Sequence, residues 1–320
     1  MNSKFVISLD FELLWGVFDV VDYSSKKQYF RQTREVIPQI LNIFQENDIH
    51  ATWATVGMLF NKDWEDWENN IPEVLPNYKK RELSAYNFGE NIKSSSTEEF
   101  CFAPKLIQQI SRTRGQELAT HTYSHYYCLE EGQTAESFDK DIEKAVAVAS
   151  GINVRLKSLV FPRNQFASDY LQICCKHGIK NVRSNPTSWY WKDANSNSIL
   201  DKLGRTGDAY FNLGKKSYPS NHLYRIHDQP LEQKASRFFR PVEENKNLRN
   251  QKIKRILSEM EWAAKNDEVY HLWWHPHNFG NLPKESINDL KIILNHFQRL
   301  QSKYNFQSVN MAELGGLLLK

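Results

Sequence analysis

Residues 117–125 have the sequence ELATHTYSH, which places two imidazoles directly after a short apolar run. Residues 117–120 predict the end of a strand, and His121 and His125 follow it, four residues apart. If the chain turns helically there, residues i and i+4 share one face and lie about 5–6 Å apart. That spacing lets two imidazole nitrogens bind one divalent ion. The stretch therefore predicts a metal site at the carboxyl end of a strand.

A third ligand is available near the N-terminus. Residues 4–9 form an apolar, strand-like run that leads into Asp10-Phe11-Glu12. On an extended chain, side chains two residues apart point to the same side. We therefore expect Asp10 and Glu12 to face one pocket. One carboxylate would complete a site of two histidines and one carboxylate, and the other would act as a base.

Composition narrows the possible functions. The 320 residues are 40% hydrophobic and 25% charged, which is enough chain for a large core. The net charge of +3 gives no reason to expect a nucleic-acid partner. No signal peptide and no apolar run of about 18 residues is recognisable, so we expect a cytoplasmic protein without stable membrane insertion. The four cysteines have neither zinc-finger nor disulfide spacing, and free thiols are expected.

Strand and helix patterns alternate along most of the chain. Strands are predicted over 4–9, 49–57, 117–120, 156–161, 179–183, 223–227, 268–274 and 306–309, and helices over 26–47, 104–112, 134–150, 167–177, 247–265 and 286–300. Pro38 marks either a kink or a fresh start within the first helix. Residues 61–100 are expected to form a surface insertion with short helices, and residues 185–221 to form long loops. The alternation predicts a single α/β domain over residues 1–320, built as a (β/α) barrel.

Polar groups fall at several predicted strand ends. The acid pair, the histidine pair, Arg163 and His275 all follow strand-like runs. Catalytic groups of parallel barrels collect at the carboxyl ends of the strands. Taken singly each is weak evidence, because a lone histidine or arginine more often has a structural role. Their joint placement along one alternating chain predicts a common site at the mouth of the barrel.

Together these motifs resemble those of the polysaccharide deacetylases, the nodulation-factor deacetylase homology family. Residues 8–12, Ser-Leu-Asp-Phe-Glu, are similar to a variant of the first family motif, Thr-Phe-Asp-Asp, in which the two acids are spaced by one residue. Residues 121–125 match the second motif, His-(Ser/Thr)-x-x-His. Residues 272–275, Leu-Trp-Trp-His, match the fifth motif, Leu-x-x-His. The resemblance runs in order over residues 4 to about 310.

Two motifs depart from the family pattern. In place of the third motif, Arg-x-Pro-Tyr, residues 163–166 keep only Arg163 and an aromatic ring, Phe166. The fourth motif, of the type Asp-x-x-Asp-Trp, has no matching aspartate, although Asn185 and Trp189 lie in the right region. In the family that aspartate helps to tune the catalytic acid.

The resemblance implies a distorted (β/α)7 barrel that removes N- or O-acetyl groups from sugars with the help of a metal ion. Glu12, His121 and His125 would hold the ion, which would lower the pKa of a bound water and polarise the acetyl carbonyl. Zn²⁺ is expected, and Co²⁺ or Fe²⁺ also suits these ligands. The substrate would be an acetylated sugar or a surface-polysaccharide precursor.

The resemblance also implies the remaining catalytic roles. Asp10 would be the base, and Arg163 would pair with it to keep it ionised and oriented. A backbone N–H, here that of Phe166, would help the metal to stabilise the oxyanion. His275 would protonate the leaving group as general acid. His277, two residues further on, competes with His275 for that role.

Three alternatives remain open from the sequence. Members with a spaced acid pair include hydrolases of cyclic amides or other C–N bonds, so the same barrel could act on such a substrate. The missing fourth motif is also consistent with a catalytically idle carbohydrate-binding barrel. A non-haem iron oxygenase would use the same ligand types. Such sites lie mostly on double-stranded β-folds, and the alternating helices argue against that reading.

Overall fold

Strands from both ends of the chain meet in one curled sheet. The computed structural model describes residues 2–186, 188–191, 199–211 and 214–318. The sheet order is β6-β9-β1-β2-β3-β4-β5-β7, with β10 beside β1 and β8 beside β9. All of these described pairs are parallel except β6 with β9. The strands are β1 (Lys4–Phe11), β2 (Ala51–Thr55), β3 (Gln116–Thr120), β4 (Ser158–Val160), β5 (Asn181–Ser184), β6 (Tyr218–Pro219), β7 (Leu231–Lys234), β8 (Arg237–Phe238), β9 (Glu268–Trp274) and β10 (Gln307–Val309).

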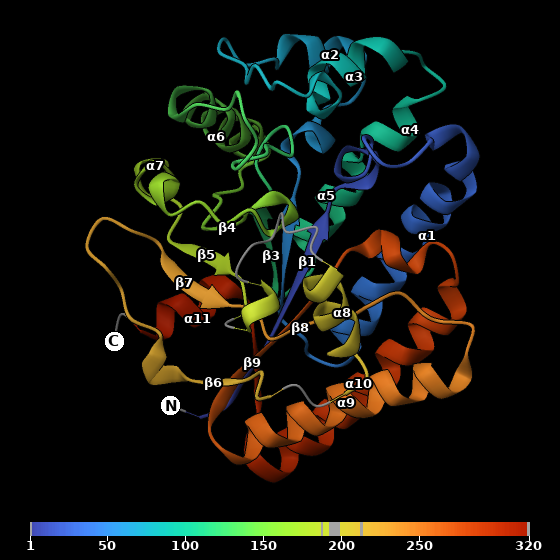
Figure 1. The fold of residues 1–320 in the computed structure, drawn as a ribbon, viewed down its shortest axis with the longest axis vertical. Coiled ribbons are helices and arrows are strands. Elements are labelled where there is room, and N and C mark those ends of the chain that lie inside the picture. Colours follow the sequence, from blue (N-terminus) through green and yellow to red (C-terminus); the bar gives the residue numbers. More distant parts are fainter. Residues whose placement is uncertain (1, 187, 192–198, 212–213, 319–320) are drawn as a thin grey trace.

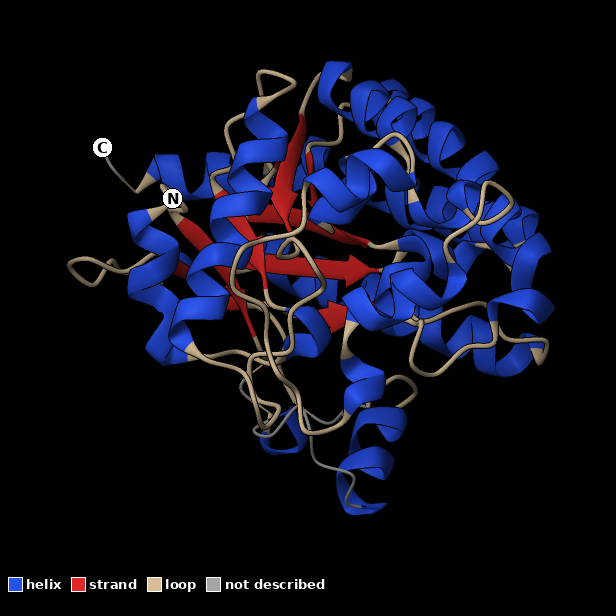
Figure 2. Ribbon diagram, turned by 90° about the horizontal axis from the view of Figure 1, so that it is seen from above, coloured by secondary structure: helices blue, strands red, loops and turns tan. Residues whose placement is uncertain are grey.

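Helices surround this sheet, as the two ribbon views show together (Figures 1 and 2). They are α1 (Lys27–Glu46), α2 (Trp64–Asn69), α3 (Ala85–Ile92), α4 (Glu98–Cys101), α5 (Pro104–Arg112), α6 (Ala135–Ser150), α7 (Leu171–Lys176), α8 (Ile199–Gly207), α9 (Lys246–Lys265), α10 (Pro283–Tyr304) and α11 (Met311–Leu317). Short 3-10 turns follow several strands, among them η1 (Leu13–Gly16), η3 (Gly57–Phe60), η5 (Pro162–Asn164) and η9 (Pro276–Phe279). This curled, mostly parallel sheet confirms the predicted distorted barrel.

The first strand is central to the sheet. β1 borders β2, β9 and β10, and every one of its residues is buried. A nearly continuous apolar sequence is typical of a parallel strand that is covered on both faces. The polar exceptions, Lys4, Ser8 and Asp10, are therefore buried among partners that must satisfy them. β1 delivers Asp10 at its carboxyl end and Glu12 just beyond it.

The first helix continues through its proline. α1 contains Pro38, so the predicted alternative of a fresh helix start is wrong. Phe30, Val36, Ile40 and Phe44 lie on its buried face. Burying such side chains stabilises the fold by about 1.5–3 kcal/mol each. That gain offsets the cost of roughly 3 kcal/mol that a proline imposes inside a helix.

Residues 61–100, predicted as a surface insertion, pack against the preceding part of the chain through tryptophans. Residues 61–100 contain α2, α3 and the start of α4, drawn at the top of Figure 1. The rings of Trp64 and Trp67 meet edge to face at 5.4 Å, and Trp15 of η1 stacks on Trp67 at 6.4 Å. The indole N–H of Trp15 donates to the carbonyl of Cys101 at 2.7 Å. These rings are core residues and not a carbohydrate-binding surface.

Two sequence predictions fail in the segment after β5. Residues 223–227 do not form a strand, and Leu223 is buried whereas Tyr224 and Ile226 are exposed. The strand that follows these residues is β7, and α8 and β6 lie where only loops were predicted. Residues 187, 192–198 and 212–213 of that predicted loop region lie outside the described part of the chain.

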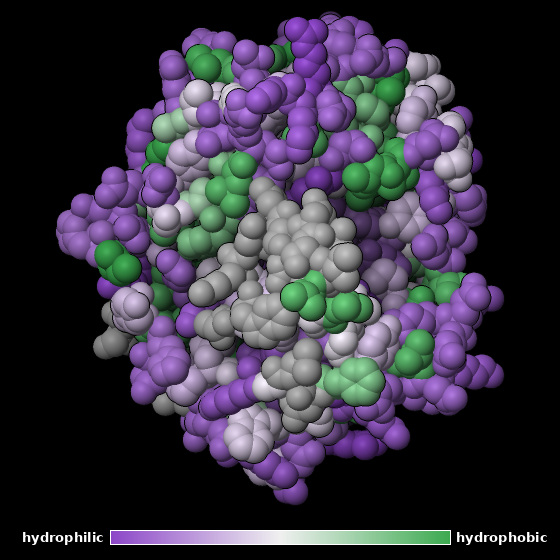
Figure 3. All heavy atoms as spheres, in the orientation of Figure 1, coloured by the Kyte–Doolittle hydropathy of each residue, from purple (hydrophilic) through white to green (hydrophobic). Residues whose placement is uncertain are grey.

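The described helices and the face drawn in Figure 3 bear on whether the chain crosses a membrane. None of the described helices is long and apolar enough to cross a bilayer. On the face in Figure 3, hydrophobic residues form scattered small groups between hydrophilic ones. All four cysteines are free thiols, as predicted, and all but Cys175 are buried.

Candidate metal centre

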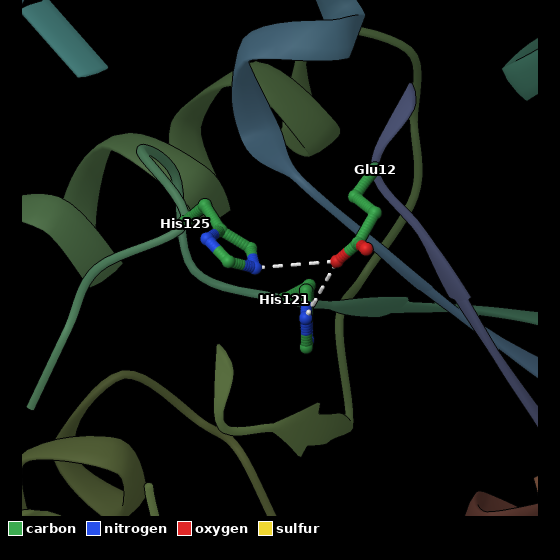
Figure 4. A group of neighbouring side chains, drawn as sticks. All are labelled: Glu12, His121 and His125. Carbon is green, nitrogen blue, oxygen red and sulfur yellow. Dashed lines mark ion pairs between the residues drawn. The ribbon is translucent and has the colours of Figure 1, made fainter. Parts of the chain in front are cut away.

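Glu12, His121 and His125 converge as the sequence predicts. The Nε2 atoms of His121 and His125 each lie 3.2 Å from Oε2 of Glu12 (Figure 4). All three side chains are buried. A tetrahedral ion with bonds of about 2.0–2.1 Å separates its ligand atoms by about 3.3 Å. The two distances to Glu12 match that spacing, and all three ligand atoms lie within 4.8 Å of one another, the only such group of three among the described residues.

The hydrogen bonds of this group favour a cation at its centre. Nδ1 of His121 lies 2.8 Å from the carbonyl of Val160, so Nδ1 carries the proton and Nε2 presents a lone pair. Burial lowers the pKa of His125 below its ordinary value and favours the neutral imidazole that binds metals. Oε2 of Glu12 is buried without a hydrogen-bond partner in the described chain. A buried carboxylate oxygen 3.2 Å from two imidazole nitrogens fits the ligand set of a divalent ion.

The charge of Glu12 is retained despite its burial. Burial by itself raises the pKa of this carboxyl, but the imidazoles of His275, His121 and His125 outweigh it. The pKa of Glu12 therefore lies well below its ordinary value. The residue is available as an anionic ligand at neutral pH.

The histidine pair lies on a bent loop and not on a helical turn. Thr122 and His125 have left-handed backbone angles, with φ of 62° and 55°. The loop is attached to the end of β2, since the N–H of His121 donates to Thr55 and the N–H of Gly57 donates to Thr122. The predicted helical face is wrong, but the two Nε2 atoms still reach one point because the loop folds back on itself.

Two glycines provide the space for this arrangement. A Cβ at Gly16 would lie 2.0 Å from Cδ of Glu12. A Cβ at Gly57 would lie 2.8 Å from Cα of Tyr123, between the two histidines. Real Cβ atoms do not approach other atoms so closely, so any larger residue would displace the Glu12 side chain or the loop.

Asp10 is paired with Arg183 and not, as predicted, with Arg163. Nη1 and Nη2 of Arg183 donate to Oδ1 and Oδ2 of Asp10, each at 2.7 Å. Burial alone raises the pKa of Asp10, but Arg183, His121 and His275 more than compensate and lower it below its ordinary value. β5 and β1 both point these side chains into the barrel, which is why the pairing forms there.

Further contacts fix the Arg183 guanidinium. Nη1 also donates to Oγ of Ser8 at 3.0 Å, and His271 Nε2 lies 2.8 Å from that hydroxyl. The guanidinium carbon lies 4.3 Å from the centroid of the Trp273 ring. Nη2 donates to the side chain of Asn164 at 3.1 Å. Arg183 is thus held from several sides in one position.

Arg163 pairs with Asp19 and not with Asp10, because its backbone conformation directs the side chain to Asp19. Its φ is 53°, and the left-handed turn directs the side chain to Asp19. Nη2 donates to both carboxylate oxygens of Asp19 at 2.6 Å. The guanidinium also lies over the ring of Tyr127, 4.9 Å from its centroid. Tyr127 in turn contacts the metal-ligand candidate His125 edge to face.

Phe166 does not present the expected oxyanion donor. Its backbone N–H donates to the carbonyl of Asn164 at 2.8 Å, so that prediction is wrong for this structure. The same carbonyl accepts from the side chain of Asn185 at 2.9 Å. The side chain of Trp189 lies outside what the structure describes.

Both candidate acids lie beside the acid pair. Nε2 of His275 is 3.7 Å from Oδ2 of Asp10 and 3.6 Å from Oε1 of Glu12. Nδ1 of His277 is 3.7 Å from the same Glu12 oxygen, and its ring stacks on His275 at 4.8 Å. Burial, reinforced by His275, lowers the pKa of His277 to about 3. The side chain of His275 is 24% exposed, whereas that of His277 is 7% exposed.

Sequence reasoning missed two residues of this region. Arg183 stood at the end of a predicted strand, where a charged residue after an apolar run was itself a signal. Asp141 lies in the predicted helix 134–150, on the same buried face as Phe138 and Ile142. A carboxylate on the apolar face of a helix is a signal of a specific polar partner.

Comparison with known proteins agrees with the motifs. The family model of polysaccharide deacetylases matches residues 17–182, slightly more than half of the chain. The chain belongs to the polysaccharide deacetylase family. The matched part includes both histidines of the metal-ligand set and Arg163. No curated protein matches the sequence.

Solved structures share the fold at low sequence identity. A Mycobacterium smegmatis protein assigned as a polysaccharide deacetylase has a TM-score of 0.61 at 12% identity, over 99% of this chain and 91% of its own. The α-amylase AmyC of Thermotoga maritima has a TM-score of 0.58 at 10% identity, over 98% and 74%. The allantoinase PuuE has a TM-score of 0.54 at 10% identity, over 98% and 88%. These similarities establish the fold and not the reaction.

Proposed function

We propose that the chain is a metal-dependent deacetylase that hydrolyses the acetyl group of an N-acetylated or O-acetylated sugar, free or within a surface-polysaccharide precursor. One observation carries the proposal. Among the described residues, a buried carboxylate oxygen of Glu12 that accepts no hydrogen bond lies 3.2 Å from two imidazole nitrogens. Membership of the polysaccharide deacetylase family supports the substrate class.

Glu12, His121 and His125 would hold the ion, and Zn²⁺ suits these ligands best. When bound, the ion polarises the acetyl carbonyl and lowers the pKa of water from 15.7 toward about 7. Asp10 takes the proton of the attacking water. The bidentate contact with Arg183 keeps Asp10 ionised and fixes its orientation.

His275 acts as general acid. It lies beside both carboxylates and is the more exposed of the two neighbouring histidines, so a substrate can reach it. It donates a proton to the leaving amine or alcohol while acetate departs with the oxygen of the water. His277 is too deeply buried for that role, and its low pKa keeps it neutral.

The test begins with metal content. Wild-type protein, dialysed against Zn²⁺, Co²⁺ or Fe²⁺, should retain about one ion per chain, as one three-ligand site requires. The double variant His121→Ala, His125→Ala should retain none. A matched double variant, His222→Ala, His227→Ala, removes two exposed histidines and should behave as wild type. An ion-free wild type would exclude the metal-dependent reaction.

Acetate release from panels of N-acetyl and O-acetyl sugars then tests the substrate. Allantoin belongs in the same panel, because a spaced acid pair is also consistent with cyclic-amide hydrolysis. Turnover of allantoin alone would favour that alternative. Sugar binding without turnover, in protein that holds its ion, would favour a catalytically idle barrel.

A further inference from the structure

Asp141 is a buried carboxylate outside the ligand set. It lies on α6 with a side chain that is almost fully enclosed, next to Phe138 and Ile142. Burial raises the pKa of Asp141 to about 6. A carboxyl group in such surroundings needs hydrogen-bond donors.

The hydrogen-bond donors to Asp141 come from the histidine loop. The backbone N–H of Tyr123 donates to Oδ1 at 2.6 Å. The backbone N–H of Ser124 donates to Oδ2 at 3.0 Å, and the Ser124 hydroxyl donates to the same oxygen. Tyr123 and Ser124 are two of the three residues between His121 and His125. One side chain of α6 therefore holds the middle of the loop.

The loop needs such support because its conformation is unfavourable. Thr122 and His125 both have positive φ, which non-glycine residues rarely adopt. The Thr122 side chain satisfies the N–H of Tyr126 but leaves the N–H groups of Tyr123 and Ser124 for another acceptor. Asp141 supplies that acceptor from a rigid helix.

We propose that Asp141 is a positioning residue that holds the His121–His125 loop in the geometry that binds the metal ion. The inference rests on the proposed metal-dependent function. Asp141 does not contact the ion itself. The two carboxylate oxygens of Asp141 accept three hydrogen bonds. An amide side chain cannot replace this carboxylate, because the NH2 group of the amide would face a donor N–H.

The test compares Asp141→Asn with wild type and with Asp139→Asn. Asp139 lies on the same helix but pairs outward with Lys176 and His177. Equilibrium dialysis with Zn²⁺ alone should show affinity lowered about 10–100-fold in Asp141→Asn, as for other outer-shell partners, and unchanged in Asp139→Asn. The visible spectrum of Co²⁺-loaded Asp141→Asn should also differ from wild type. Excess metal should restore kcat with KM unchanged.

A second variant covers the case in which Asp141→Asn does not fold. Ser124→Ala removes one of the three hydrogen bonds from the loop side and should lower Zn²⁺ affinity by a smaller factor. Wild-type affinity and spectrum in the folded variants would overturn the role of Asp141 and leave the proposed function intact. Absence of any ion in wild type would overturn both.

Discussion

Arg183 and Asp10 form a bidentate ion pair inside the barrel, with both nitrogen–oxygen distances at 2.7 Å. Only 1% and 3% of the two side chains are exposed. Two buried charges in good geometry compensate each other, whereas either one alone is costly. The pair therefore links the stability of the barrel to the state of the proposed base.

Replacing Arg183 should affect both stability and catalysis. In Arg183→Met, Asp10 is left as a buried, unpaired charge, and the free energy of unfolding should fall by about 3–5 kcal/mol. The kcat for acetate release should fall at least about 100-fold, because Asp10 loses its orientation. Urea unfolding and initial rates measure the two effects. Arg163→Met is the informative comparison. If Arg163→Met lost kcat while Arg183→Met stayed active, the prediction from sequence that Arg163 orients Asp10 would be correct.

Gly16 should be essential to the ligand geometry. In Gly16→Ala, the new Cβ must displace Cδ of Glu12, from which it would be only 2.0 Å away. We expect Zn²⁺ affinity to fall at least about 10-fold, which equilibrium dialysis would detect. Gly207→Ala is the control, since a Cβ there meets nothing within 4 Å. Equal affinities in both variants would contradict the steric argument.

Metal removal should lower the stability of the wild type. An ion at 100 times its dissociation constant stabilises the folded state by about 2.7 kcal/mol. Chelation should therefore lower the melting temperature, and Glu12→Gln should melt at the same temperature with or without Zn²⁺. Glu46→Gln, an exposed change at the end of α1, should keep the wild-type response. A Zn²⁺ response in Glu12→Gln like that of wild type would place the ion elsewhere.

Replacing His275 should lower kcat more than replacing its neighbour His277. His275→Asn should lower kcat by about 10²–10⁴-fold while the protein keeps its ion, because a general acid is lost. His277→Asn should have a smaller effect on kcat, since His277 is buried and neutral. Steady-state rates together with metal analysis separate acid loss from ion loss. The reverse order of effects would assign the acid to His277.

Stability should depend on pH through His50. Its Nδ1 lies 2.8 Å from Glu313, and that hydrogen bond raises the pKa of His50 above its ordinary value. The folded protein therefore binds the proton more tightly than the unfolded chain. The stabilising contribution is complete below about pH 6.5, the unfolded value, and is lost as the pH rises through the raised pKa.

The corresponding measurement is urea unfolding of wild type and His50→Gln from about pH 5.5 to about pH 8.5. The difference in the free energy of unfolding should be largest at the acidic end and should shrink as the pH rises. His222→Gln, at an exposed position, should show no such trend. A difference that grows with pH would contradict the sign of the shift.

The alternation of strands and helices was predictable because local patterns determine it. α5 was predicted with its correct bounds, and α6 to within one residue. α8 was missed because residues 185–221, rich in Asn, Ser, Gly, Trp and Tyr, show no clear helical period in the sequence. β7 was missed because it alternates buried and partly buried residues in a largely polar sequence.

The ligand set was predictable and its supporting contacts were not. The prediction that His121 and His125 converge is correct although the predicted helical turn is a bent loop. A ligand set requires only that the ligand atoms lie close together, whatever the backbone conformation. Asp10 pairs with Arg183 and not with Arg163, because the left-handed backbone at Arg163 directs that side chain to Asp19. No residue pattern in the sequence indicates this backbone conformation. Asp141 acts across a distance of 17 residues in the chain, so only the packing of α6 against the loop reveals it.

β1 also determines when the protein can first become active during its synthesis. β1 ends at Phe11, whereas its neighbour β9 begins only at Glu268, so a long stretch of chain is synthesised between the two strands. At about 5–20 residues per second, the apolar first strand waits on the order of tens of seconds for that neighbour. Throughout this interval it offers an open edge to other nascent chains. The acid pair at its end therefore reaches its folded surroundings only after β9 has been synthesised.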